Sequence, residues 1–109
     1  MATVRHLVID QGTTFSLTLT VADSNGNALN LTGYTLRGQL RKSYGSTSYT
    51  SFTTSSGDLS GGELTIALTA TQTSSLRAGR YVYDIEIDNA GEVTRVLEGI
   101  ITVTPEVTR

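Results

Sequence analysis

Apolar and polar residues alternate along several short stretches of this chain. In the stretch TTFSLTLTV, one face is formed by Phe15, Leu17, Leu19 and Val21, and the residues between them are Ser or Thr. Alternation with a period of two is typical of a strand with one buried and one wet face. The pattern predicts a half-buried strand here, followed by a reversal at Ser24–Asn27, because Asn and Gly tolerate left-handed backbone angles.

The same alternation recurs at short intervals along the rest of the chain. It is present in YTLRGQLR, ELTIALT and YVYDIEID, and a shorter apolar stretch, VRHLVID, lies near the amino terminus. The polar segment 43–62 contains STSYTSFTT, whose composition favours an edge strand, and TATQTSSL predicts a single helical turn. The last run, VTRVLEGIITV, is apolar at Val93, Leu97, Ile101 and Val103, and Val96 and Ile100 add a second apolar face, so we expect part of it to be covered on both sides.

About seven strands at this regular spacing predict an all-β fold, an immunoglobulin-like antiparallel β-sandwich. The 109 residues match one domain spanning 1–109, which at this size buries roughly 65% of the surface of its unfolded chain. The chain contains 11 Gly and a single Pro, and Ser and Thr are abundant, a composition that favours strands and turns over helices.

The stretch LRAGRYVYDIEID suggests how one corner of this sandwich closes. Leu76, Gly79 and Tyr81 form the spacing L-x-x-G-x-Y. In immunoglobulin-like sandwiches a Tyr near the start of the penultimate strand turns its hydroxyl back to the preceding backbone. We therefore expect Leu76 to enter the core, Gly79 to take the turn and Tyr81 to close the corner, which makes the aromatic stripe structural.

Charge and cysteine content exclude several classes of partner and site. Eight basic and 10 acidic residues give a net charge of −2, without a basic run that would indicate nucleic acid. No Cys is present, so neither a disulfide nor a thiolate metal site can form. The amino-terminal apolar stretch is too short for a signal sequence or a membrane span, which predicts a soluble protein made inside the cell.

The sequence offers no assembled catalytic motif, and we expect neither enzymatic activity nor a cofactor or metal. The sole histidine, His6, lies in a short strand without a nucleophile elbow, and we expect it to be a chance neighbour on a strand face. Asp84, Glu86 and Asp88 line one face of a strand, where alternating acids are normally the wet side. A hydrolase would need His6 beside a Ser and an acid in a cleft.

Basic and aromatic residues are interleaved in one part of the chain, at Arg37, Arg41, Tyr44 and Tyr49. Three basic charges, counting Lys42, are a weak field for nucleic acid, and long side chains can simply shield the outer face of a strand. The shielding role is the simpler interpretation; because protein interfaces favour Tyr and Arg, these residues are also the first candidates if the protein has a protein-binding face. A carbohydrate-binding sandwich is the competing class, with Tyr44 and Tyr49 as stacking platforms.

Both halves of the chain resemble a known protein family. The segment IDQGTTFSLTLTVADSNGNALNLTGYTLRGQLRKS resembles the opening of small virion proteins of tailed bacteriophages, and it is similar to the amino-terminal immunoglobulin-like domain of phage baseplate upper proteins. The shared features are a Gly after an acidic or amide residue, an alternating strand, a D-x-N-G-like turn, and LTGYT before a basic strand. LTATQTSSLRAGRYVYDIEI and GEVTRVLEGIITVTPEVTR are similar to the rest of such proteins.

The resemblance implies a structural component of a tailed phage virion that acts by docking and not by chemistry. It implies a docking or adaptor module of the tail, baseplate or neck, with decoration of the capsid surface as the alternative. The expected partners are other virion proteins in a symmetric, multi-copy assembly, with no nucleic acid and no membrane; the chain is made in the host cytoplasm and located in the virion. Only TPEVTR follows the last strand, so we expect a free-standing module that docks through its amino-terminal strand and its tail, where Pro105 and Val107 lie.

Overall fold

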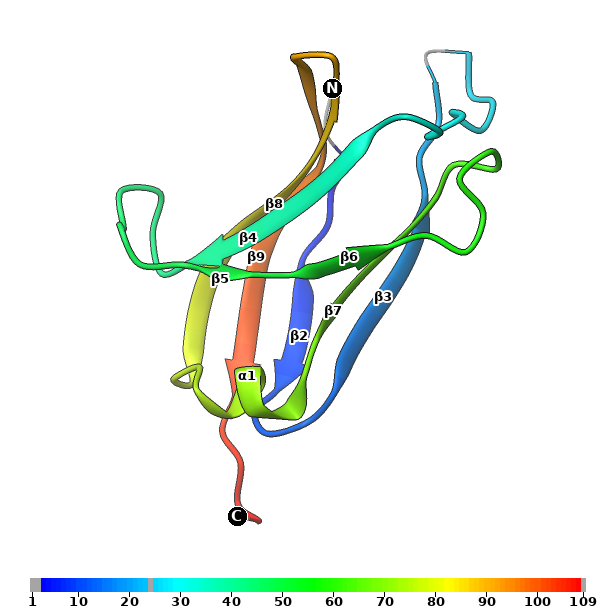
Figure 1. Cartoon of the computed structure of the whole chain (residues 1–109). Helices are drawn as coiled ribbons and strands as arrows, with labels where there is room; N and C mark the ends of the chain where they lie inside the picture. The colour runs from blue at the N-terminus through cyan, green and yellow to red at the C-terminus, as the bar shows by residue number, and fades with distance from the viewer. Residues whose placement is uncertain (1–2, 24, 109) are drawn as a thin grey trace.

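The computed structural model describes residues 3–23 and 25–108, and two β-sheets pack face to face in it (Figure 1). Ser24 of the predicted turn and Arg109 of the predicted docking tail lie outside the described residues. The larger sheet is formed by β1 (Thr3–Val4), β2 (Leu7–Asp10), β9 (Glu92–Thr104), β8 (Gly79–Asn89), β4 (Thr35–Arg41) and β5 (Thr50–Ser51). The smaller sheet is formed by β3 (Phe15–Thr20), β7 (Glu63–Leu68) and β6 (Thr53–Ser55), so the predicted all-β, immunoglobulin-like sandwich is confirmed.

The amino-terminal strand differs from the antiparallel pattern that the sequence predicts. β1 and β2 lie end to end along β9, both parallel to it and in the same register, with Thr3 opposite Leu97 and Leu7 opposite Ile101. The other strand pairs are antiparallel. Parallel neighbours cannot be joined by a hairpin. Here almost the whole chain lies between the amino-terminal strands β1 and β2 and their neighbour β9.

The predicted edge strand in STSYTSFTT is shared between the two sheets. β5 pairs with β4, and β6 pairs with β7, with Phe52 between them. The Phe52 N–H donates to the Gly38 carbonyl at 2.9 Å, while the Thr54 hydroxyl donates to the Leu36 carbonyl at 3.1 Å. The chain therefore crosses from one sheet to the other at Phe52, whose ring is buried.

The inward faces of both sheets form one apolar core. Alternate residues of β7 and β8 are buried, as their period-two patterns predict, and Leu64, Ile66 and Ile85 are fully inaccessible. The helical turn expected in TATQTSSL is α1 (Ala70–Ser74), which begins at a capping box between Thr69 and Gln72. Burial of this apolar surface is the main force that holds the sheets together.

A β-bulge in β9 overturns part of the sequence interpretation. Ile85 is paired with Leu97, but Glu86 is paired with Arg95, so Val96 is the extra residue. The bulge reverses which side chains face inward, and Val93 therefore lies on the outer face with 44% of its surface exposed. We expected part of this strand to be covered on both faces, at Val96 and Ile100: Val96 packs against the core, but the prediction is wrong at Ile100, which is 37% exposed.

Candidate interaction surface

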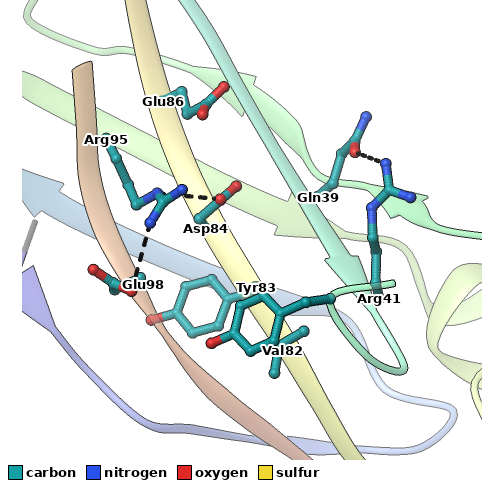
Figure 2. Close-up of a pocket in the computed structure, with 9 residues that line it drawn as sticks. Gln39, Arg41, Val82, Tyr83, Asp84, Glu86, Arg95 and Glu98 are labelled. Atoms are coloured by element: carbon teal, nitrogen blue, oxygen red, sulfur yellow. Dashed lines mark hydrogen bonds and ion pairs between the residues drawn. The ribbon is translucent and has the colours of Figure 1, made fainter. Parts of the chain in front are cut away.

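The outward side chains of the larger sheet form a charged face. β4 contributes Arg37, Gln39 and Arg41, and β8 contributes Asp84 and Glu86, because these residues alternate with the buried ones. A hollow of about 240 Å³ lies on this face (Figure 2). Its walls are formed by Gln39, Arg41, Tyr44, Val82, Tyr83, Asp84, Glu86, Arg95 and Glu98.

Two arginines hold the carboxylates of the charged face in place. Arg95 lies 3.3 Å from Asp84 and 3.8 Å from Glu98, and both pairs are visible in the hollow (Figure 2). Arg37 lies 2.9 Å from Glu86, and its guanidinium also approaches Asp88 at 3.8 Å. About half of each arginine side chain is exposed, so these pairs order the surface while adding little stability.

Asp84 is partly buried among the charged residues that line the hollow. Burial raises the pKa of Asp84, the negative charge of Glu86 raises it further, and Arg95 opposes both effects. Three carboxylates, of Asp84, Glu86 and Glu98, and two guanidinium groups, of Arg41 and Arg95, line the hollow, so its acidic residues outnumber its basic residues by one. A basic group of a partner would relieve the same repulsion.

Arg41 braces the loop that carries the two exposed tyrosines. Its guanidinium donates to the Gln39 side-chain oxygen at 3.0 Å and to the Ser46 carbonyl, and it lies 4.9 Å from the centre of the Tyr49 ring. Tyr44 and Tyr49 are 83% and 54% exposed. The structure thus brings Arg41 and Tyr49 into contact and places Tyr44 on the wall of the same hollow.

The other predicted interaction residues lie elsewhere. Arg37 is further along β4, where it is held by its ion pairs. Pro105 and Val107 belong to the tail that leaves the sandwich beyond α1, whereas loop 43–49 extends from its side (Figure 1). Val107 is 93% exposed, and the backbone N–H of the residue before it donates to the Gln11 side chain at 3.0 Å. The six predicted residues therefore do not form one site.

The corner residues lie where the chain enters β8. Leu76 is buried in the core, and the Tyr81 hydroxyl donates to the Arg77 carbonyl at 2.8 Å. Gly79 has a φ of 140°, and a side chain there would meet the ammonium of Lys42, which lies over the Tyr81 ring. These contacts tie the connection after α1 to the start of β8.

A second tyrosine anchors the amino-terminal strand, and nothing in the local sequence indicates it. The hydroxyl of Tyr83 donates to the Arg5 carbonyl at 2.6 Å. Tyr83 is paired with Gly99, where an added Cβ would stand 2.2 Å from the Arg5 oxygen. In a regular parallel ladder the Ile100 N–H would donate to that carbonyl; here it donates to Nδ1 of His6 at 3.1 Å. His6 thus replaces a backbone acceptor between β1 and β2.

The residues considered for catalysis have structural contacts in this arrangement. The ring of His6 accepts a backbone N–H, and Asp84, Glu86 and Asp88 pair with arginines. Within residues 3–23 and 25–108, no group of three or more His, Cys, Asp or Glu side chains is placed to hold a metal ion. The same residues contain no helix long and apolar enough to cross a membrane.

Comparison with known proteins relates this chain to others by fold. No protein-family model and no curated protein sequence matches it. The N-terminal domain of phage TP901-1 ORF48 is similar at a TM-score of 0.59 and 12% identity, over 91% of this chain and 84% of that domain. InlP of Listeria monocytogenes is similar at a TM-score of 0.51 and 17% identity, over 94% of this chain but 28% of InlP. At these identities the likeness shows the fold alone.

Proposed function

We propose that this protein is a non-enzymatic docking or adaptor module of a tailed phage particle, located in the tail, baseplate or neck. The observation that carries the proposal is the likeness to the N-terminal domain of a phage protein, which extends over nearly the whole of both chains. The resemblance of the sequence to small virion proteins supports the same role. Decoration of the capsid surface is the alternative position in the particle.

The loop 43–49 supplies a contact surface suited to this role. Exposed Tyr side chains bury large area at low entropic cost, and Arg and Tyr are the residue types found most often at the centre of protein interfaces. Arg41 holds the loop through Gln39, Ser46 and Tyr49, so less ordering is needed on binding. In a multi-copy assembly, such contacts would be multiplied by avidity.

The first experiment is immunogold electron microscopy of phage particles produced by cells that carry this gene. Labelling of the particle is the expected result, and its position on the tail, neck or head distinguishes an adaptor from capsid decoration. Particles that remain unlabelled, with the epitope shown to be accessible on a denatured sample, would contradict the proposal. Retention on a glycan array would then favour the carbohydrate-binding alternative.

A second experiment identifies the docking element. Tyr44→Ser and Tyr49→Ser change exposed side chains, so we expect the protein to fold but to be incorporated into particles less efficiently. Val107→Ser tests the tail in the same way. The matched control is Thr53→Ser, an exposed residue on the smaller sheet. Loss of incorporation for the loop variants alone assigns docking to loop 43–49, whereas loss for Val107→Ser alone assigns it to the tail.

A further inference from the structure

Exposed apolar side chains cluster on the outer face of β1, β2, β9 and β8. Val4 and Val8 are 64% and 65% exposed, and Ile100 is 37% exposed. Their register places them together, because Val4 is opposite Glu98, Val8 is opposite Thr102, and Ile100 lies between these two positions on β9. Val82, paired with Ile100, extends the apolar centre onto β8.

Charges of opposite sign flank this apolar centre along the strands. On β8, Arg80 lies two residues before Val82. It is exposed, and it makes no ion pair within the part of the chain that the structure describes. Two residues after Val82 is Asp84, which lies opposite Glu98 of β9; Arg95 lies 3.3 Å from Asp84 and 3.8 Å from Glu98, so these two carboxylates share one guanidinium. Arg80 and this excess of carboxylate over guanidinium therefore lie on opposite sides of Val82, each two residues from it along β8.

We propose that this face docks against the same face of a second copy of the chain. A two-fold axis that lies between the two faces and crosses the strands at Val82 and Ile100 makes the copies antiparallel. Arg80 then faces Asp84 of the other copy, and Val8 faces Val4. Val82 and Ile100 each meet their own symmetry mates on the axis, so the patch is complementary to itself, as a two-fold interface requires.

The geometry is that of an ordinary sheet-on-sheet contact. Aligned sheets pack about 10 Å apart with their strands within about 30° of each other, and apolar side chains fill the space between them. On β4, Arg41 is paired with Val82, so it lies at the level of the axis and would face Arg41 of the other copy. Its guanidinium already donates to Gln39 and Ser46 within its own copy. The two copies of Arg80 and Asp84 would supply two ion pairs per dimer, partly removed from solvent.

Sedimentation velocity over a concentration series tests the dimer. We expect the wild type to associate, and Arg80→Glu to raise the dissociation constant roughly 100-fold, because both symmetry-related pairs become repulsive. Asp84→Arg should act in the same way. The double variant Arg80→Glu/Asp84→Arg should restore association to within about threefold, since it exchanges the charges across the axis.

Chemical cross-linking gives an independent readout. The chain has no Cys, so a single Ile100→Cys variant carries one thiol, which lies beside its symmetry mate on the axis. A short bismaleimide should then convert it to covalent dimer. The control is Thr18→Cys, which is exposed on the smaller sheet and should remain monomeric under the same treatment.

A wild type that stays monomeric at all concentrations would overturn the dimer, as would charge variants that leave association unchanged. Equal cross-linking of Ile100→Cys and Thr18→Cys would also overturn it. The dimer does not rest on the phage role: gold labelling of particles by a monomeric protein would refute only the dimer, and a dimer absent from particles would refute only the proposed function.

Discussion

Tyr81 and Tyr83 lie two residues apart on β8, and each donates its hydroxyl to a backbone carbonyl, but they fix very different parts of the chain. Tyr81 bonds Arg77, four residues upstream, whereas Tyr83 bonds Arg5, 78 residues away. Both rings are buried. The first bond closes a local corner, and the second holds the amino-terminal strand against the sheet.

The comparison shows that a long-range anchor depends on residues from several segments of the chain. The Tyr81 corner is formed within the stretch that contains L-x-x-G-x-Y. The Tyr83 anchor needs Gly99 for close approach, and His6 to accept the N–H of Ile100. The same strand presents Val4 and Val8 to the proposed dimer contact, so the long-range anchor also positions that surface.

The largest effect should come from Gly99→Ala. An added Cβ would stand 2.2 Å from the Arg5 carbonyl oxygen, which is backbone and cannot rotate away, so β1 must shift and the Tyr83 bond must lengthen. We expect a loss of about 3 kcal/mol in the free energy of unfolding, at the upper end of typical overpacking costs. Urea denaturation measures it.

Gly45→Ala is the control for this substitution. A Cβ at Gly45 would meet nothing within 4 Å, and its φ does not lie in the left-handed region. Its free energy of unfolding should change by less than about 0.5 kcal/mol. If Gly99→Ala and Gly45→Ala lose the same free energy of unfolding, the close approach of the Arg5 carbonyl to Gly99 is not the reason that glycine is needed there.

Tyr83→Phe should have the next largest effect. It leaves the Arg5 carbonyl without its buried donor, at a cost of about 2 kcal/mol. Burial raises the pKa of Tyr83 to about 12, although the charge of Arg5 opposes the shift. In the unfolded chain this tyrosine ionises near pH 10, so its contribution to stability is complete below about pH 10 and is lost as pH rises toward 12.

The pH dependence separates the hydroxyl from the ring. The free energy of unfolding of the wild type minus that of Tyr83→Phe should be constant near neutral pH and should decrease between pH 10 and 12. Thermal melts across that range measure it. A difference that does not change with pH would mean that the hydroxyl is not held in the buried environment seen here.

The division between local and long-range features also explains what the sequence predicts. The alternation of β3, β7 and β8 and the turn of α1 follow from residues close in the chain, and all were predicted. The parallel pairing of β1 and β2, the crossover at Phe52 and the bulge at Val96 depend on which strands become neighbours. Local periodicity carries no information on that choice.

The residues of the candidate surface also divide into those that the local sequence indicates and those that only strand pairing brings together. Arg41 and Tyr49 lie close in the sequence, and their interleaving with other basic and aromatic residues indicates a candidate interaction segment. Arg95 enters the hollow through pairing of β8 with β9, and Asp84 alone gives no sign of it. The apolar and charged positions of the proposed dimer contact became neighbours only in the folded sheet.

Tyr81→Phe should be milder than Tyr83→Phe. The Tyr81 bond joins residues four positions apart, so its loss does not release a distant strand, and Tyr81 is 9% exposed against 4% for Tyr83. We expect a loss of about 1 kcal/mol from urea denaturation. Tyr34→Phe is the control, because the Tyr34 hydroxyl makes no hydrogen bond within the described residues, and it should remain near the wild type. A larger loss for Tyr81→Phe than for Tyr83→Phe would reverse the comparison between the two anchors.

The smallest effect should come from the histidine that completes the long-range anchor. His6→Ala removes the acceptor of the Ile100 N–H, and His6 and Ile100 are both exposed enough for water to take its place. We expect a loss of about 0.5 kcal/mol and faster hydrogen exchange of the Ile100 amide. His6→Asn places a side-chain oxygen close to the position of Nδ1 and should restore slow exchange. If exchange is equally fast in both variants, the imidazole does not act as the acceptor, and the break between β1 and β2 must be held by Tyr83 and Gly99 alone.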